Sequence, residues 1–270
     1  MLIDNVALLI PTHQPHYNLI YNLINKFKAN EIFIDIFLVF SSQNDWNNFL
    51  LKDAINPLII TEPLKTNSII TFKKFFGLKK LINSKYEYII CCDSELDFIP
   101  ENFSKENLND KINKIFNNKK IYAGDTTGVW VNIISNISAN VFPDKINELK
   151  KITNDFNLYF WWSDLPVYRK SDLIHFFDTF NYENIVWHHF DHLIYQYYLI
   201  LFHDFKIIDT TPITNRKWSL EGLNTNDPLV LNKLLEIDYG FSWNNKSFYN
   251  IAKEYIIMNK GLFIYHVDSC

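Results

Sequence analysis

The sequence predicts an α/β fold with a mainly parallel central sheet flanked by helices. The first hundred residues alternate continuous apolar runs of strand length with segments in which apolar residues recur at helical spacing. This alternation is typical of parallel sheets whose two faces are covered by helices. The chain has 270 residues, 48% of them hydrophobic and 17% aromatic, so it can bury a large core. We expect residues 1–100 to form a regular half and residues 101–270 a more irregular half, packed as one continuous domain.

In the regular half, four apolar runs predict strands and three segments predict helices. We expect the strands at residues 6–11, 32–40, 58–60 and 86–92, and the helices at residues 17–27, 45–51 and 69–82. The loop at 12–16 follows the first strand. In the last of these helices, the apolar side chains are expected to face the core. Four lysines are expected to lie mostly on its outer face: Lys73, Lys74, Lys79 and Lys80.

The second half carries shorter and less regular patterns. Strands are expected at residues 121–123, 158–162 (continued by 166–169), 206–209 and 262–266, and residues 126–134 predict an irregular or edge strand. Helices are expected at residues 111–116, 190–202, 227–235 and 246–258, together with one that Ser171 caps and that runs to residue 177.

The composition argues against several classes of protein. A net charge of -4 gives no electrostatic basis for binding nucleic acid. Three cysteines, two of them adjacent, make no disulfide framework and fit a reducing cytosol. Residues 1–11 lack the basic start of a signal peptide, and no apolar run approaches the roughly 20 residues of a membrane helix. We therefore expect a cytoplasmic protein, with peripheral contact at the inner face of the membrane left open.

The most informative motif is the acid triplet Asp93-Ser94-Glu95, which follows the predicted strand at 86–92. In extended geometry the two carboxylates point the same way, because strand side chains alternate between faces. Their hard oxygen ligands suit Mg²⁺ or Mn²⁺, and ligands of open α/β sheets bind at the carboxyl ends of the strands. A polar boundary between strand and loop remains the alternative interpretation.

The order of these elements resembles that of glycosyltransferases with the GT-A fold. The resemblance rests on the segments 6–13, 72–78, 93–95, 166–170 and 190–195. It covers most of the chain as an order of elements. The sequence departs from the family's DxD motif at Glu95, where the second aspartate usually stands.

The resemblance implies transfer of a sugar from a nucleotide-sugar donor, UDP-type before others, to a hydroxyl of a glycan acceptor of the lipooligosaccharide or capsule type. Residues 1–100 would bind the donor and residues 101–270 the acceptor. Asp93 and Glu95 would hold Mn²⁺ or Mg²⁺, with His266 as a further ligand. The candidates for contact with the donor are Pro11, Thr12, His13, Ser41, Lys74, Asp93, Ser94 and Glu95. The candidates for contact with the acceptor or diphosphate are Trp162, Arg169, His189 and Arg216.

Asp191 opens the predicted helix at 190–202 and, by the resemblance, matches the general base of inverting enzymes. An acid stabilised by the helix dipole is the structural alternative. His188, Asp191 and His192 at helical spacing would instead suit Zn²⁺ and a metallohydrolase. A non-catalytic protein that binds sugar or nucleotide is the third hypothesis.

Overall fold

The computed structural model describes residues 2–62, 64, 66–125, 129–160, 165–214, 228–236 and 249–265. The chain divides into two compact units. The first comprises Met1–Pro100 and Pro166–Trp187, and the second comprises Glu101–Leu165 and His188–Cys270. The segment 166–187 therefore belongs with the first hundred residues.

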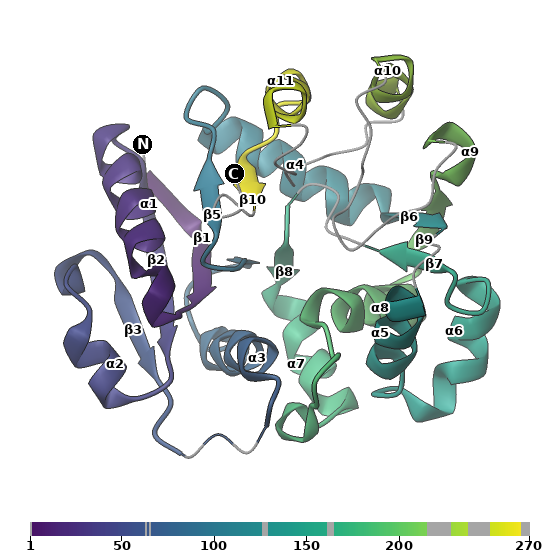
Figure 1. Cartoon of the computed structure of the whole chain (residues 1–270), viewed down its shortest axis with the longest axis horizontal. Helices are drawn as coiled ribbons and strands as arrows, with labels where there is room; N and C mark the ends of the chain where they lie inside the picture. Colours follow the sequence, from purple (N-terminus) through teal and green to yellow (C-terminus); the bar gives the residue numbers. More distant parts are fainter. Residues whose placement is uncertain are drawn as a thin grey trace. The chain divides into compact units, whose positions relative to one another are not determined.

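The first unit is built on a five-stranded sheet (Figure 1) with the order β3-β2-β1-β4-β8. The strands are β1 (Leu2–Pro11), β2 (Phe33–Phe40), β3 (Asn56–Ile59), β4 (Tyr88–Cys91) and β8 (Val167–Arg169). The first four run parallel and β8 runs antiparallel to β4. Residues 6–10 of β1 are fully buried, as expected of a strand covered on both faces. The predicted α/β class with a mainly parallel sheet is confirmed.

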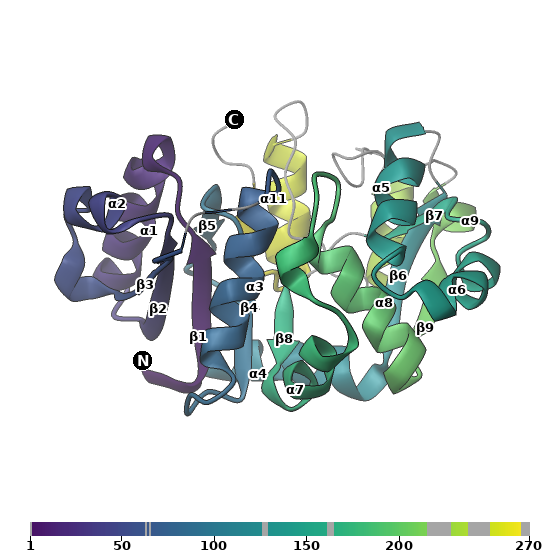
Figure 2. The same cartoon turned by 90° about the horizontal axis from the view of Figure 1, so that it is seen from below.

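Helices connect the parallel strands. They are the 3-10 helices η1 (Gln14–His16) and η2 (Lys52–Ala54) and the α-helices α1 (Tyr17–Ala29), α2 (Gln43–Asn48) and α3 (Ile69–Leu81). Ser42 caps α2 because its hydroxyl accepts the Asp45 N–H at 3.2 Å. Since crossovers are right-handed and the strand order reverses at β1, α1 and α3 cover opposite faces of the sheet. Figure 2 shows α3 lying along β1 and β4, and it also contacts β2.

The prediction that the α3 lysines mostly face solvent is half wrong. Lys79 and Lys80 are exposed, whereas Lys73 and Lys74 are buried. Gly77 explains the difference, because a Cβ at this position would lie 2.6 Å from Leu9 Cδ1. The helix therefore approaches the sheet so closely that side chains flanking its inner face are covered as well.

The remaining elements of the first unit are β5 (Leu96–Phe98), α7 (Lys170–Thr179) and η4 (Tyr182–Asn184). Phe98 stacks on Phe27 of α1, with 4.3 Å between ring centroids. The Phe75 ring of α3 contacts the rings of Phe176, Phe177, Phe180 and Tyr182, which fixes α7 and η4 on that helix. The predicted Ser171 cap is wrong, because Arg169 occupies the cap position and makes no side-chain capping bond.

The second unit contains a three-stranded sheet with the order β7-β6-β9. The strands are β6 (Lys120–Asp125), β7 (Leu158–Phe160) and β9 (Lys206–Asp209), and β10 (Phe263–Tyr265) is a further short strand. The helices are α4 (Lys105–Asn118), α5 (Val129–Ala139), η3 (Pro143–Lys145), α6 (Ile146–Ile152), α8 (Asp191–His203), α9 (Thr211–Thr214), α10 (Pro228–Glu236) and α11 (Tyr249–Met258). Residues 191–200 of α8 are all buried, and α8 packs against α5.

Two predictions for the second half are wrong. Residues 129–134 belong to helix α5 rather than to an irregular strand, because Val131 and Ile134 pack inward at helical spacing. Residues 166–169 do not continue the strand at 158–162. β7 pairs with β6 in the second unit, whereas β8 pairs with β4 in the first. Pairing partners of such short strands are decided by distant segments that local sequence does not specify.

No helix in the described part of the chain has the length and apolar character needed to cross a membrane.

Candidate active site

Three loops meet at the carboxyl edge of the parallel sheet. The pairing of Leu9 with Cys91, and of Pro11 with Val39, brings the ends of β1, β2 and β4 to the same edge. The segments that leave this edge are 12–16 after β1, 41–42 after β2 and 92–95 after β4. Contacts between the first and third loops are direct, since His16 Nδ1 lies 2.9 Å from Ser94 Oγ. The edge thus gathers most of the residues that sequence reasoning assigned to the donor.

Thr12 anchors the first loop to the sheet. Its N–H and its hydroxyl both donate to the Val39 carbonyl, at 2.9 and 2.8 Å. Its own carbonyl accepts from Lys73 Nζ at 2.5 Å. Thr12 and Pro11 are buried, while His13 is exposed and Ser41 is half-buried. Thr12 therefore fixes the shape of the loop, and His13, Gln14 and Pro15 of the same loop are exposed to solvent.

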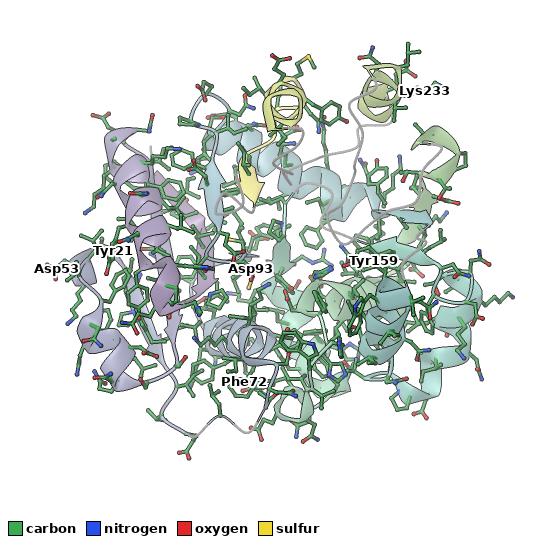
Figure 3. All side chains as sticks on the ribbon, in the orientation of Figure 1. Tyr21, Asp53, Phe72, Asp93, Tyr159 and Lys233 are labelled. Atoms are coloured by element: carbon green, nitrogen blue, oxygen red, sulfur yellow. The ribbon has the colours of Figure 1, made fainter. Side chains whose placement is uncertain are left out.

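The two acids of the triplet turn toward different partners. Asp93 Oδ1 lies 3.1 Å from Lys74 Nζ of α3, and Glu95 Oε1 lies 3.3 Å from His16 Nδ1 of η1. The Asp93 side chain, labelled in Figure 3, is 38% exposed and that of Lys74 is 8% exposed. The chain bends at Ser94 and Glu95. The expectation that extended geometry would point both carboxylates the same way therefore does not apply here.

Asp93 and Glu95 offer the kind of oxygen ligands that Mg²⁺ and Mn²⁺ prefer. Within the described ranges, no three His, Cys, Asp or Glu side chains form a group that could hold a metal ion. His266, the predicted third ligand, lies outside these ranges. A cation on the two acids would therefore complete its coordination with phosphate oxygens and water, as Mg²⁺ commonly does. Binding of a metal here stays a prediction.

Burial shifts the pKa values of several groups around the first loop. Burial lowers the pKa of Lys73 to about 8, against an opposing effect of the Asp45 carboxylate. The His13 side chain is exposed, but its partial desolvation, together with the neighbouring His16 and Lys73, lowers the pKa of His13 against an opposing effect of Asp45. Burial, with the Asp45 charge, raises the pKa of Tyr17 to about 12, and its hydroxyl donates to the Asp45 carbonyl at 3.1 Å. Lys73 is therefore still mostly charged at neutral pH.

Two other residues of the first unit have structural partners. Asp97 pairs with Lys26 and accepts the Phe98 N–H at 2.9 Å, which fits the role of a local loop acid. Arg169 pairs with Tyr88 at the amino end of β4, so it lies at the edge of the sheet opposite Asp93. Its guanidinium donates to Asp172 Oδ1 at 2.8 and 3.0 Å. This placement contradicts a contact between Arg169 and a diphosphate at Asp93.

Asp191, the predicted base, is the first residue of α8 in the second unit and is only 2% exposed. An acid in this position is stabilised by the helix dipole. Burial raises the pKa of the Tyr159 hydroxyl well above its usual value, with smaller effects from Tyr197 and Asp191. Tyr159, on β7 and labelled in Figure 3, contacts the His192 ring edge-on at 6.3 Å. Asp191 thus lies in a buried cluster of aromatic and polar side chains, and its role as base stays a prediction.

The zinc arrangement predicted for His188, Asp191 and His192 is not formed. The helix begins only at Asp191, so His188 lies in the preceding turn with φ of 78° and shares no helical face with His192. Ser138 of α5 holds this turn, because its hydroxyl donates to the His188 carbonyl at 3.3 Å and accepts the Phe190 N–H at 3.1 Å. The His188 ring lies 4.8 Å from that of Trp130. His189 is half-buried in the same turn.

The sequence predicts His16 in the loop at 12–16 and Lys73 on the outer face of its helix without a specific contact for either, and it singles out neither Ser138 nor Tyr159. The one available signal for Lys73 was its position beside Lys74 and between phenylalanines, shortly before Gly77. Local sequence patterns do not predict contacts with distant segments, and such contacts define the roles of His16, Ser138 and Tyr159. Trp162 and Arg216, like His266, lie outside the described residues.

No protein-family model matches this chain, and no curated protein matches it either. One solved structure that it resembles is mannose-1-phosphate geranyltransferase from Thermus thermophilus. The sequence identity is 8%, the TM-score is 0.36, and the match covers 78% of this chain and 70% of that chain. A similarity this low does not bear on function.

Proposed function

We propose that the protein is a glycosyltransferase that moves a sugar from a nucleotide-sugar to a hydroxyl of a glycan acceptor. The observation that carries the proposal is the meeting of the 12–16 loop with the acid triplet at the carboxyl edge of a parallel sheet, seen in the 2.9 Å contact between His16 and Ser94. Ligands of open α/β sheets bind outside this edge. The GT-A resemblance supplies the reaction class.

We assign binding of the nucleotide-sugar donor to the carboxyl edge of the sheet. Thr12 holds the first loop on the sheet so that His13 can line the nucleoside. Lys74 places positive charge beside Asp93, where a diphosphate would need it, and the His16 ring lies 3.3 Å from Glu95. A divalent cation held by the two acids would offset the charge that develops on the diphosphate as the glycosidic bond breaks.

The acceptor half is assigned to Asp191. A carboxylate can take the proton of the attacking hydroxyl if it lies within hydrogen-bond reach of it. The helix dipole would favour the ionised form of this carboxylate, against the effect of its burial, and the turn that Ser138 holds would fix its orientation. Glycans of the lipooligosaccharide or capsule type, and a UDP-type donor, are the substrates that the GT-A resemblance favours.

The test is a screen of nucleotides and nucleotide-sugars with Mn²⁺, read first by thermal shift and then by acceptor-dependent release of the nucleoside diphosphate. A ligand specific to the native state at 100 times its Kd stabilises it by about 2.7 kcal/mol. We expect one class of nucleotide-sugar to raise the melting temperature and to be turned over. Binding without turnover toward any acceptor would leave a non-catalytic binding protein, and no binding at all would refute the proposal.

A further inference from the structure

Helix α3 buries two consecutive lysines. Lys73 and Lys74 are 3% and 6% exposed, although lysine is almost never fully buried without a partner. Consecutive side chains of a helix point about 100° apart. The two ammonium groups accordingly reach different segments of the carboxyl edge: Lys73 the Thr12 carbonyl and Lys74 the Asp93 carboxylate.

Gly77 places these lysines. A Cβ there would lie 2.6 and 2.8 Å from the two methyl groups of Leu9 and 3.0 Å from Val39 Cγ2, so a larger residue would force Leu9 or the helix to shift. Lys73 precedes Gly77 by four residues, which is about one helical turn, and Lys74 by three. The second turn of α3 is thereby brought against the segments that follow β1 and β4.

The two lysines bring positive charge to an edge that also holds the carboxylates of Asp45, Asp93 and Glu95. The hydrogen-bond acceptor of Lys73 is a neutral carbonyl, and the first turn of α3 carries no acid to oppose the positive end of the helix dipole. Lys74 is buried but its partner Asp93 is 38% exposed, so the ion pair faces solvent on the Asp93 side. A ligand can therefore approach the pair without displacing the helix.

We propose that Lys74 is an exchangeable counter-ion: it pairs with Asp93 in the ligand-free protein and with a phosphate oxygen when a diphosphate binds. Lys73 meanwhile holds the Thr12 carbonyl and keeps the loop in shape. The edge then binds a diphosphate without any divalent cation, and the exchange frees Asp93 to take one afterwards. The inference rests on the proposed function only in naming the diphosphate as part of a nucleotide.

The experiment titrates inorganic pyrophosphate, and separately UDP, into the full chain by calorimetry in the presence of EDTA. We expect the wild type to bind, and Lys74→Met to weaken binding about tenfold or more, because hydrogen bonds between charged groups are the strong ones. Lys80→Met, on the exposed side of the same helix, is the matched control and should bind like the wild type. If Lys74→Met does not fold, Lys74→Arg, which keeps the positive charge, is titrated in its place.

The variant Asp93→Asn distinguishes most clearly between an anion bound by Lys74 and an anion bound through a metal on Asp93. If Lys74 carries the anion, removing its competing carboxylate should strengthen binding in EDTA. If a metal on Asp93 carries the anion, the wild type should not bind in EDTA, and Asp93→Asn should abolish the binding seen with Mn²⁺. Absence of wild-type binding in EDTA, or equal affinities of wild type and Lys74→Met, would overturn the inference.

The outcomes of this experiment can be distinguished from the outcomes that test the proposed function. Lysine-dependent binding of pyrophosphate in EDTA, with no nucleotide-sugar turned over, would support the anion site and leave the proposed reaction without support. If a nucleotide-sugar is turned over but no donor binds without Mn²⁺, the proposed reaction would be supported and the anion site would not.

Discussion

The two acids on which the proposed reaction depends lie in opposite kinds of surroundings. Asp93 follows a strand, is 38% exposed and pairs with a lysine, whereas Asp191 opens a helix, is 2% exposed and lies among aromatic side chains. An exposed, ion-paired acid can exchange its partner for a ligand. A buried acid at a helix start is held in a fixed orientation. The contrast suits a ligand-binding role for Asp93 and a positioned-base role for Asp191.

The largest effect is expected from Asp191→Asn. Loss of a positioned base typically slows a reaction about 10²–10⁴-fold, so kcat should fall by this factor while donor affinity stays nearly unchanged. Steady-state kinetics and donor titration measure the two quantities. Asp204→Asn, at the C-terminal cap of the same helix with φ of 58°, is the control and should leave kcat unchanged, because Asn tolerates this conformation. Full activity of Asp191→Asn would reduce Asp191 to a structural helix acid.

Gly77→Ala should disturb the groups around Asp93 and leave those around Asp191 unchanged. The new methyl group would meet Leu9 at 2.6 Å, and overpacking of this kind destabilises a core by about 1–3 kcal/mol. Chemical denaturation measures the loss. Pyrophosphate affinity should fall as well, since α3 must move away from the edge. The double variant Gly77→Ala/Leu9→Ala, which makes room for the methyl group, should recover part of that affinity. No recovery would mean that the close approach does not place the lysines.

Ser138→Ala tests how the turn before Asp191 is held. The buried Ser138 hydroxyl makes two hydrogen bonds, each contributing about 0.5–1.5 kcal/mol to stability, and both would be lost. The equally buried Ser135 lies three residues earlier on α5, and neither hydrogen bond that holds the turn involves it. Ser135→Ala is therefore the control and should leave the turn before Asp191 unchanged. If the turn positions Asp191, Ser138→Ala alone should also lower kcat with little change in KM.

The sequence predicts the fold better than the site, for a physical reason. Long continuous runs such as residues 6–11 have one stable environment, a strand covered on both faces. Short mixed runs such as 126–134 and 158–169 take the structure that their packing partners impose. The position of the acid triplet follows from the end of β4. The partners of its carboxylates, however, depend on the bend at Ser94 and on the close approach of α3 at Gly77, and neither is visible in local periodicity.

The smallest effect expected is a pH dependence of pyrophosphate binding near Asp93, which the step assigned to Asp191 should not share. Burial holds the pKa of Lys73 at about 8, below its usual 10.5, although Asp45 opposes the shift and His13 lies nearby. Pyrophosphate affinity should therefore decline as the pH rises through about 8, because the charge on Lys73 is lost there. The linkage to stability has the opposite sign. Between about 8 and 10.5 the unfolded chain binds more protons at this lysine, so its contribution to the free energy of unfolding increases with pH.

Lys73→Met should remove both dependences, whereas Lys80→Met should keep them. Calorimetric titrations at pH 7, 8 and 9 and denaturation across the same range measure the two effects. Metal-free binding that does not change between pH 7 and 9 in the wild type would show that the charge of Lys73 plays no part, and that its contact with the Thr12 carbonyl only supports the loop. The rate step assigned to Asp191 should not follow this titration, because Lys73 belongs to the donor edge and acts on binding.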